Sequence, residues 1–95
     1  MVPTIDQQLS GCSKDGVFNC SYWDLGGANL HAADLFKANF EGANLKSANL
    51  EGANLKSANL EGAKLKDVGL QGAIADEDTT WPEGFDPVAA GVIIE

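Results

Sequence analysis

The chain has few of the residues that most often carry catalysis, metal binding or nucleic-acid binding. Its 95 residues include one histidine, two cysteines, and 6 Lys plus Arg against 14 Asp plus Glu, which gives a formal net charge of -8. A nucleic-acid-binding surface needs a basic patch that displaces counterions from the phosphates, so we expect no nucleic-acid partner. His31 has no second His, Cys or acidic cluster in register with it, and we therefore expect no metal, no cofactor and no catalytic residue.

Long apolar segments are also missing. No run approaches the roughly 18 apolar residues of a membrane-spanning helix, and residues 1–6 have neither the basic start nor the apolar core of a signal peptide. We expect a soluble chain without a membrane partner, cytoplasmic as written. If a removed leader preceded Met1, the periplasm or the thylakoid lumen is the expected compartment instead.

The two cysteines, Cys12 and Cys20, have a spacing that fits no zinc or redox motif. Counted back from the repeats described below, Cys20 takes an inward position. Three interpretations are open: two small buried or half-buried thiols, a disulfide that joins the N-terminal segment to the first coil, or a reactive thiol. The disulfide would form only in an oxidising compartment.

What the sequence does have is a five-residue repeat, which reads ANFEG ANLKS ANLEG ANLKS ANLEG AKL from Ala38 to Leu65. In an α-helix five residues turn the chain by about 500°, so the leucines would scatter around the axis without forming an apolar stripe. In a flat strand an odd period sends successive leucines to opposite faces, whereas Ala48 and Leu50 within one repeat share a face. The chain must therefore bend once per repeat, as in an all-β solenoid whose Ala and Leu side chains point inward.

Two-residue corners separate the inward pairs. Gly42 stands at the second corner position and suits a type II turn, which needs a positive φ there, while Ser47 and Ser57 predict a different turn type at alternate corners. Alternating corners favour an even number of sides. Four sides would place Glu41 near Glu61 and Lys46 near Lys66 in adjacent coils, where like charges repel mildly, whereas three sides would put Glu over Lys. The residues alone leave the number of sides open.

The tandem A-N-L-x-x pattern resembles that of the pentapeptide-repeat family. The match covers Phe18 to Ala75, and the stretch from Thr79 to Pro87 reads TTWPEGFDP, which is similar to the T-x-W-P-x-G-F-D-P segment that often closes bacterial members. The resemblance implies a right-handed, four-sided (quadrilateral) β-helix. Here it would have about three coils and a cap at each end, because the end coils of a solenoid have only one neighbour.

Residues 1–17 are irregular and are expected to form the N-terminal cap of a single domain that spans all 95 residues. Thr4 and Gln7 are spaced as a capping box, which predicts one helical turn there. Trp23 stands at an inward position that later repeats give to alanine, so we expect it to fill the open end of the helix beside the cap. Regular coiling should then begin near Leu25.

Residues 18–75 are expected to form the repeats, and residues 76–95 the C-terminal cap. In this cap Trp81 and Phe85 should cover the last coil, since large aromatic side chains supply most of the covering area. The apolar end from Val92 to Ile94 either adds to this lid or exposes an adhesive strand edge.

The repeat also predicts which way each column of side chains points. His31 and Phe36 occupy outward corners, and the Asn and Asp residues that precede the leucines are expected to bond neighbouring backbone rather than a ligand. The alanines from Ala28 to Ala63 take one inward position. The other inward position belongs to Leu30, Leu35, Phe40, Leu45, Leu50, Leu55, Leu60 and Leu65.

A filled solenoid offers no pocket with convergent polar groups, so we expect no enzyme activity. The first hypothesis is a small structural or protein–protein interaction module with an unidentified protein partner, either monomeric or weakly associated end to end. The alternative, which the resemblance implies, is an acidic DNA-mimicking inhibitor of a type II topoisomerase. Against it, Lys46, Lys56, Lys64 and Lys66 interrupt the acidic charge, and about three coils reach only about 14 Å at the strand spacing of ~4.8 Å.

Overall fold

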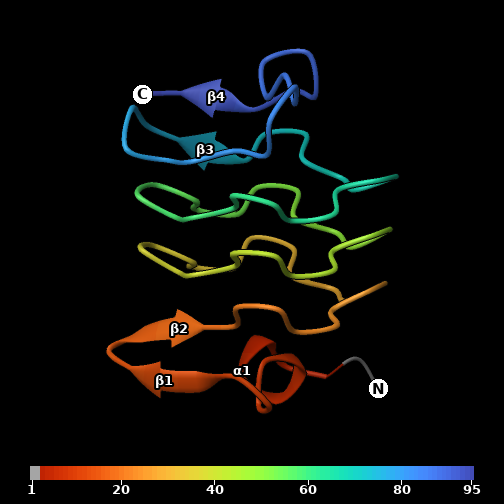
Figure 1. Ribbon diagram of the computed structural model, residues 1–95, viewed down its shortest axis with the longest axis vertical. Helices are drawn as coiled ribbons and strands as arrows, with labels where there is room; N and C mark the ends of the chain where they lie inside the picture. Colours follow the sequence, from red (N-terminus) through yellow and green to blue (C-terminus); the bar gives the residue numbers. More distant parts are fainter. Residues whose placement is uncertain (1–2) are drawn as a thin grey trace.

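The computed structural model describes residues 3–95 as a stack of coils measuring 30 × 26 × 21 Å, and this described part begins at one end of the stack and finishes at the other (Figure 1). Parallel bridges of single residues join each coil to the next between positions twenty apart, from Asn19 with Asn39 to Asn54 with Ile74. The paired segments are this short because the chain bends after every five residues. The body is therefore an all-β solenoid of the β-helix type.

Within each repeat the hydrogen bonds run in both directions along the stack. The Asn49 N–H donates to the Ala28 carbonyl at 2.9 Å, and the Asn49 carbonyl accepts from the Leu30 N–H at 2.8 Å, so Asn49 bonds the preceding coil. Its neighbour Leu50 donates to the Gly69 carbonyl of the following coil at 2.7 Å. Interior coils thus pair their main chain on both sides, whereas the first and last coils need other partners.

The corners all bend in the same sense. The second corner residue has a positive φ at every repeat of the stack, for example 65° at Gly42, 61° at Ser47 and 60° at Ser57. In both kinds of corner the next N–H closes the turn, as when Ala48 donates to the Leu45 carbonyl at 3.0 Å. The prediction of a different turn at the serines is therefore wrong in the sign of φ. Coils stack only if successive corners match, so the serines accept the left-handed conformation that glycine adopts freely.

Apolar side chains fill the interior. The side chains that are 0% exposed include Leu30, Leu35, Phe40, Leu45, Leu50, Leu55 and Leu60. The alanines from Ala33 to Ala63 are buried beside them, and Ala28 is partly buried. Leu65, predicted to lie in the core with the other leucines, is only partly buried. The reason is that the chain beyond residue 75 does not lay a complete regular coil over it.

The N-terminal cap begins with helix α1 (Ile5–Gln8). Reciprocal side-chain to main-chain bonds join Thr4 and Gln7 at its start, so the predicted capping box is confirmed. Strands β1 (Ser13–Asp15) and β2 (Val17–Asn19) then form an antiparallel hairpin. Helix and hairpin together lie across the start of the stack (Figure 1).

Regular coiling begins earlier than the predicted Leu25, because Asn19 already bridges to Asn39. Trp23 does not fill the end of the interior as predicted, since its side chain is 43% exposed. Its six-membered ring lies against Gly11 of the cap, where an added Cβ would collide with it. Later repeats place alanine in this column, and their close packing leaves no room inside for an indole.

Strand β3 (Ile74–Ala75) pairs in parallel with β4 (Ile93–Ile94), the last strand of the chain. Between the two strands the five-residue period is lost, because Asn59 bridges to Thr80, which lies twenty-one positions on. The segment that joins β3 to β4 consists of turns and one bridge above the last repeats (Figure 1). Within residues 3–95 no helix has the length and apolar character needed to cross a membrane.

Candidate interaction surfaces

Two columns of outward corner residues carry like charges in adjacent coils. Glu41 and Glu61 stand in adjacent coils, because the Gly42 N–H donates to the Glu61 carbonyl at 2.9 Å. Lys46 and Lys66 stand in the next column, where the Ser47 N–H donates to the Lys66 carbonyl, also at 2.9 Å. The molecule therefore presents an acidic ridge, Glu41 and Glu61, beside a basic ridge, Lys46 and Lys66. Solvent and salt screen the repulsion within each ridge.

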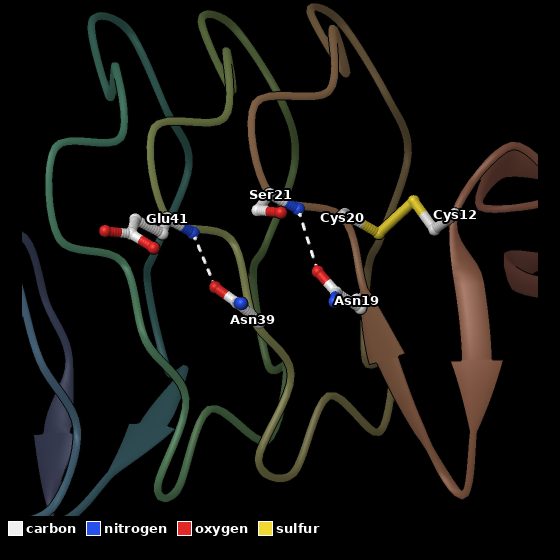
Figure 2. Close-up of a disulfide and its surroundings, with 6 residues drawn as sticks. All are labelled: Cys12, Asn19, Cys20, Ser21, Asn39 and Glu41. Carbon is white, nitrogen blue, oxygen red and sulfur yellow. Dashed lines mark hydrogen bonds between the residues drawn. A yellow bond between two sulfur atoms is a disulfide. The ribbon is translucent and has the colours of Figure 1, made fainter.

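The Asn and Asp side chains before the corners bond their own turns. In Figure 2 the Oδ1 atom of Asn39 accepts from the Glu41 N–H at 2.9 Å, and that of Asn19 accepts from the Ser21 N–H at 3.3 Å. The same contact recurs at the intervening and later corners through residue 59. This column therefore orients the turns, as expected for short side chains that compete for local backbone groups.

His31 and Phe36 both lie at outward corners. His31 is exposed, and residues 3–95 hold no group of three or more His, Cys, Asp or Glu side chains arranged to bind a metal. The Phe36 side chain is 43% exposed, and the Nζ atom of Lys37 lies 5.4 Å from its ring centroid. Phe36 therefore exposes part of an aromatic ring, and no described group of ligating side chains includes His31.

Cys12 and Cys20 form a disulfide with a Cα–Cα distance of 4.8 Å (Figure 2). Cys20 is 0% exposed in the first coil, and Cys12 is 9% exposed in the cap. Of the three interpretations of these cysteines, the structure contains the bridge. It fastens the N-terminal cap to the start of the stack.

Gln8 supplies main-chain pairing that the first coil lacks. Its Oε1 atom accepts from the Asn29 N–H, and its Nε2 atom donates to the Asn29 carbonyl at 2.6 Å. Inside the stack, Asn49 makes the same two bonds with the main chain of Ala28 and Leu30. The glutamine amide therefore replaces one residue of a preceding coil, and it satisfies two groups that would otherwise form an open edge.

The C-terminal lid contains an aromatic pair. The rings of Trp81 and Phe85 stack with centroids 5.5 Å apart and an interplanar angle of 21°. Both are partly buried against the core, and Phe85 lines a shallow concavity together with Ala63 and Leu65. The lid thus covers the last repeats incompletely on the side of Leu65.

Asp76 lies where the spacing between bridged residues lengthens from twenty positions, at Asn54 and Ile74, to twenty-one, at Asn59 and Thr80. Its Oδ1 atom accepts from the Ser57 N–H at 2.9 Å, a bond that a main-chain carbonyl makes in the regular coils, and from the Asp78 N–H at 3.1 Å. The Thr79 hydroxyl donates to the Leu55 carbonyl at 2.9 Å. The bond from Ser57 is the main reason that the pKa of the Asp76 carboxyl is lowered, while desolvation acts in the opposite direction.

The end of the chain is anchored by one ion pair. The Nζ atom of Lys56 lies 2.7 Å from Glu95 Oε1. Its hydrogen bond to this carboxylate is the main reason that the pKa of Lys56 is raised. Because both side chains are well exposed, the pair orients the end of the chain more than it stabilises the fold.

Exposed large apolar side chains gather at the two ends of the stack. Those near the N-terminal end are Val17, Tyr22, Trp23 and Phe36, and those near the C-terminal end are Val88, Ile93 and Ile94. No member of this group falls between residues 37 and 87. Exposed apolar clusters commonly mark contact sites, so the ends are the candidate interaction surfaces.

Sequence reasoning did not identify Gln8 or Asp76. Gln8 has no periodic signal, because it lies in an irregular segment beside a second glutamine. A signal for Asp76 was available: an extra residue enters between Ala75 and Thr80, where the repeat loses its register.

Comparison with known protein families gives a match to the family described as Pentapeptide repeats (8 copies), over residues 19–52 and 43–75. Together these two ranges cover more than half of the chain. A comparison with curated proteins finds no match.

Two of the solved structures that are similar to this chain illustrate the likeness. One is Rfr23, a pentapeptide repeat protein from the cyanobacterium Cyanothece 51142, with 48% sequence identity and a TM-score of 0.66 over 66% of this chain and 43% of that one. The other is alr5209, a pentapeptide repeat protein from Nostoc Pcc 7120, with 33% identity and a TM-score of 0.55 over 96% of this chain and 92% of that one. The match thus spans less than half the length of the Cyanothece protein and nearly all of the Nostoc protein.

Proposed function

Because the chain belongs to the pentapeptide-repeat family, we propose that it acts as a small, non-enzymatic module for protein–protein interaction or structural support. Its partner is a protein that contacts one or both ends of the stack. The observation that carries this proposal is the gathering of exposed aromatic and aliphatic side chains at the two ends, with charged ridges between them. Apolar area surrounded by polar surface is typical of a contact site.

The filled interior supports a role without catalysis. Side chains such as Leu50 and Phe40 are fully buried, so a substrate would have to bind on the outside of the stack. Catalysis needs a concave site in which several polar groups converge and water is excluded. The outward Asn and Asp side chains are instead bonded to their own turns.

The finer architecture belongs to the same proposal. The family has a right-handed β-helix, and we add that this member is four-sided, because a coil of twenty residues equals four five-residue repeats. On this basis about three coils form a single domain over residues 1–95. We assign residues 1–17 to its N-terminal cap, of which residues 1–2 lie outside the described part of the chain, residues 18–75 to the repeats and residues 76–95 to the C-terminal cap.

An interaction module is favoured over an acidic DNA mimic. DNA presents continuous lines of negative phosphates, whereas here the basic ridge, Lys46 and Lys66, lies beside the acidic ridge, Glu41 and Glu61. The longest dimension of the stack is 30 Å. That length corresponds to only about nine base pairs at 3.4 Å each.

The test is affinity capture from a lysate of the source organism, with four immobilised baits whose folding is checked by circular dichroism. The baits are the wild type, the end variants Tyr22→Ser and Ile94→Ser, and the mid-stack control Lys46→Ser. We expect the wild type and the control to retain the same protein, in the same amount relative to the bait. At least one end variant should lose it. Equal retention by all four baits, or loss with the control alone, would contradict a role for the ends.

A further inference from the structure

A groove separates the N-terminal cap from the first coil. Its volume is about 390 Å³, and we refer to it as the cap groove. The cap contributes Ile5, Lys14 and Val17 to its lining, and the first coil contributes Ala33, Asp34 and Phe36. The groove is therefore bounded by apolar side chains on both walls.

The wall formed by the first coil also presents unpaired main chain. Among residues 3–95, neither the N–H nor the carbonyl of Asp34 has a main-chain partner. The equivalent groups of Asn54, one coil further on, bond the carbonyl of Ala33 and the N–H of Leu35, each at 2.9 Å. At Asn29, one repeat before Asp34, the side chain of the cap glutamine makes both bonds. The fold thus closes one edge position and leaves its neighbour open.

We propose that the cap groove binds an extended polypeptide segment of a partner protein, which pairs with Asp34 as a parallel strand. The partner segment would supply one carbonyl to the Asp34 N–H and one N–H to the Asp34 carbonyl, which repeats the pattern between coils. Its apolar side chains would cover Phe36 and Val17, which are 43% and 37% exposed. This inference rests on the proposed role as an interaction module and specifies its site.

The charged residues that line the groove, Asp6, Lys14 and Asp34, favour a neutral or basic segment. Lys14 and Asp6 line the groove and lie 3.7 Å apart as an ion pair, so they largely neutralise each other. The Asp34 carboxylate has no ion-pair partner within residues 3–95, and its Oδ1 atom accepts only from the N–H of Phe36 and, at 3.5 Å, from the side chain of Asn54. The net charge of -8 attracts a cationic segment further.

The test is a titration of the ¹⁵N-labelled full chain with the peptide acetyl-Lys-Val-Thr-Val-Lys-amide, followed by NMR and amide hydrogen exchange. We expect the Asp34 amide to exchange more slowly with peptide, and signals from Val17 and Phe36 to shift with it. Phe36→Ala should weaken binding by about fivefold, because part of a phenyl ring is no longer covered. The matched control His31→Ala, at the corner beside the closed edge, should bind as the wild type does. A peptide methylated on its backbone nitrogens should not bind, because it cannot donate to the Asp34 carbonyl.

Several results would overturn the inference. These are no peptide-dependent change at Asp34, protection at Ile94 of strand β4 instead, or equal binding of the methylated peptide. Sedimentation that depends on protein concentration without peptide, and that Phe36→Ala abolishes, would assign the groove to a second copy of the chain. If peptide binding fails while the end variants Tyr22→Ser or Ile94→Ser still lose a captured protein, the interaction module stands and only the groove is wrong.

Discussion

Reduction of the Cys12–Cys20 disulfide tests how much the N-terminal cap contributes to the stability of the stack. The bond joins positions 8 residues apart and holds the cap against a fully buried position of the first coil. It also holds Gln8 within reach of Asn29, whose main-chain groups have the cap as their partner. Its loss should therefore free the cap and open the first coil.

The expected magnitude follows from the length of the closed loop. In the chain-entropy treatment a cross-link between positions 8 residues apart restricts the unfolded state by about 2.5 kcal/mol at room temperature. A chain of 95 residues unfolds with an entropy of about 200 cal/mol/K, so this free energy corresponds to a fall in Tm of about 12 °C. Loss of the Gln8 clamp would add to this fall, since two main-chain groups would lose their partners.

The assay is thermal unfolding followed by circular dichroism, with oxidised and fully reduced protein at equal concentration. The variant Cys12→Ala serves as the control, because it should melt near the reduced wild type and should not respond to reductant. Amide exchange at Asn29 should accelerate on reduction, while exchange at Asn49 in the interior stays slow. Oxidised and reduced proteins that melt within about 2 °C of each other would refute the entropic reasoning.

Three further predictions concern the core and the C-terminal lid. Leu50→Ala should lower the free energy of unfolding by about 2–5 kcal/mol, because Leu50 is 0% exposed and its removal leaves a cavity that neighbouring side chains cannot fill. Denaturant unfolding measures this loss. A loss below about 1 kcal/mol would show that the surrounding side chains close the cavity. Removal of residues 76–95 should lower Tm and promote association in sedimentation, since it uncovers the last repeats and the edge of β3. Trp81→Ala or Phe85→Ala should act in the same direction. An equally stable, monomeric truncation would show that the tail is not a lid. Because the pKa of the Asp76 carboxyl is lowered in the folded state, its contribution is present above about pH 4 and is lost as the pH falls through the folded value. Asp76→Ala should therefore melt below the wild type at neutral pH, with a difference that narrows in acid, and a difference independent of pH would contradict a role for the carboxylate.

The sequence by itself determined the repeating part of this protein. The five-residue period excludes a helix and a flat strand, so the solenoid, the inward leucines and the outward corners follow from local geometry alone. The bonds from Asn39 and its equivalents to their own turns were also predictable, because they involve residues two positions apart. The capping box of Thr4 and Gln7 is local in the same way.

Only the tertiary structure decided the turn at the serines and the degree of burial at the ends. Ser47 adopts a positive φ because its corner must match the glycine corners in register with the stack. Leu65 stays partly open and Trp23 lies against Gly11, because each of them has a regular coil on one side only. Leu65 has the residue type and the period of the buried leucines, so its partial exposure could not be predicted without its surroundings.

The closure of the two ends likewise depended on contacts without any periodic signal. Gln8 reaches a carbonyl and an N–H twenty-one positions away, and Asp76 replaces a main-chain acceptor for Ser57, nineteen positions back. Interior coils obtain these partners automatically from the adjacent coil, whereas an end has to obtain them from irregular chain. Which polar side chain meets which open backbone group is set by the three-dimensional path of the caps, and for that reason the open position at Asp34 became visible only in the folded molecule.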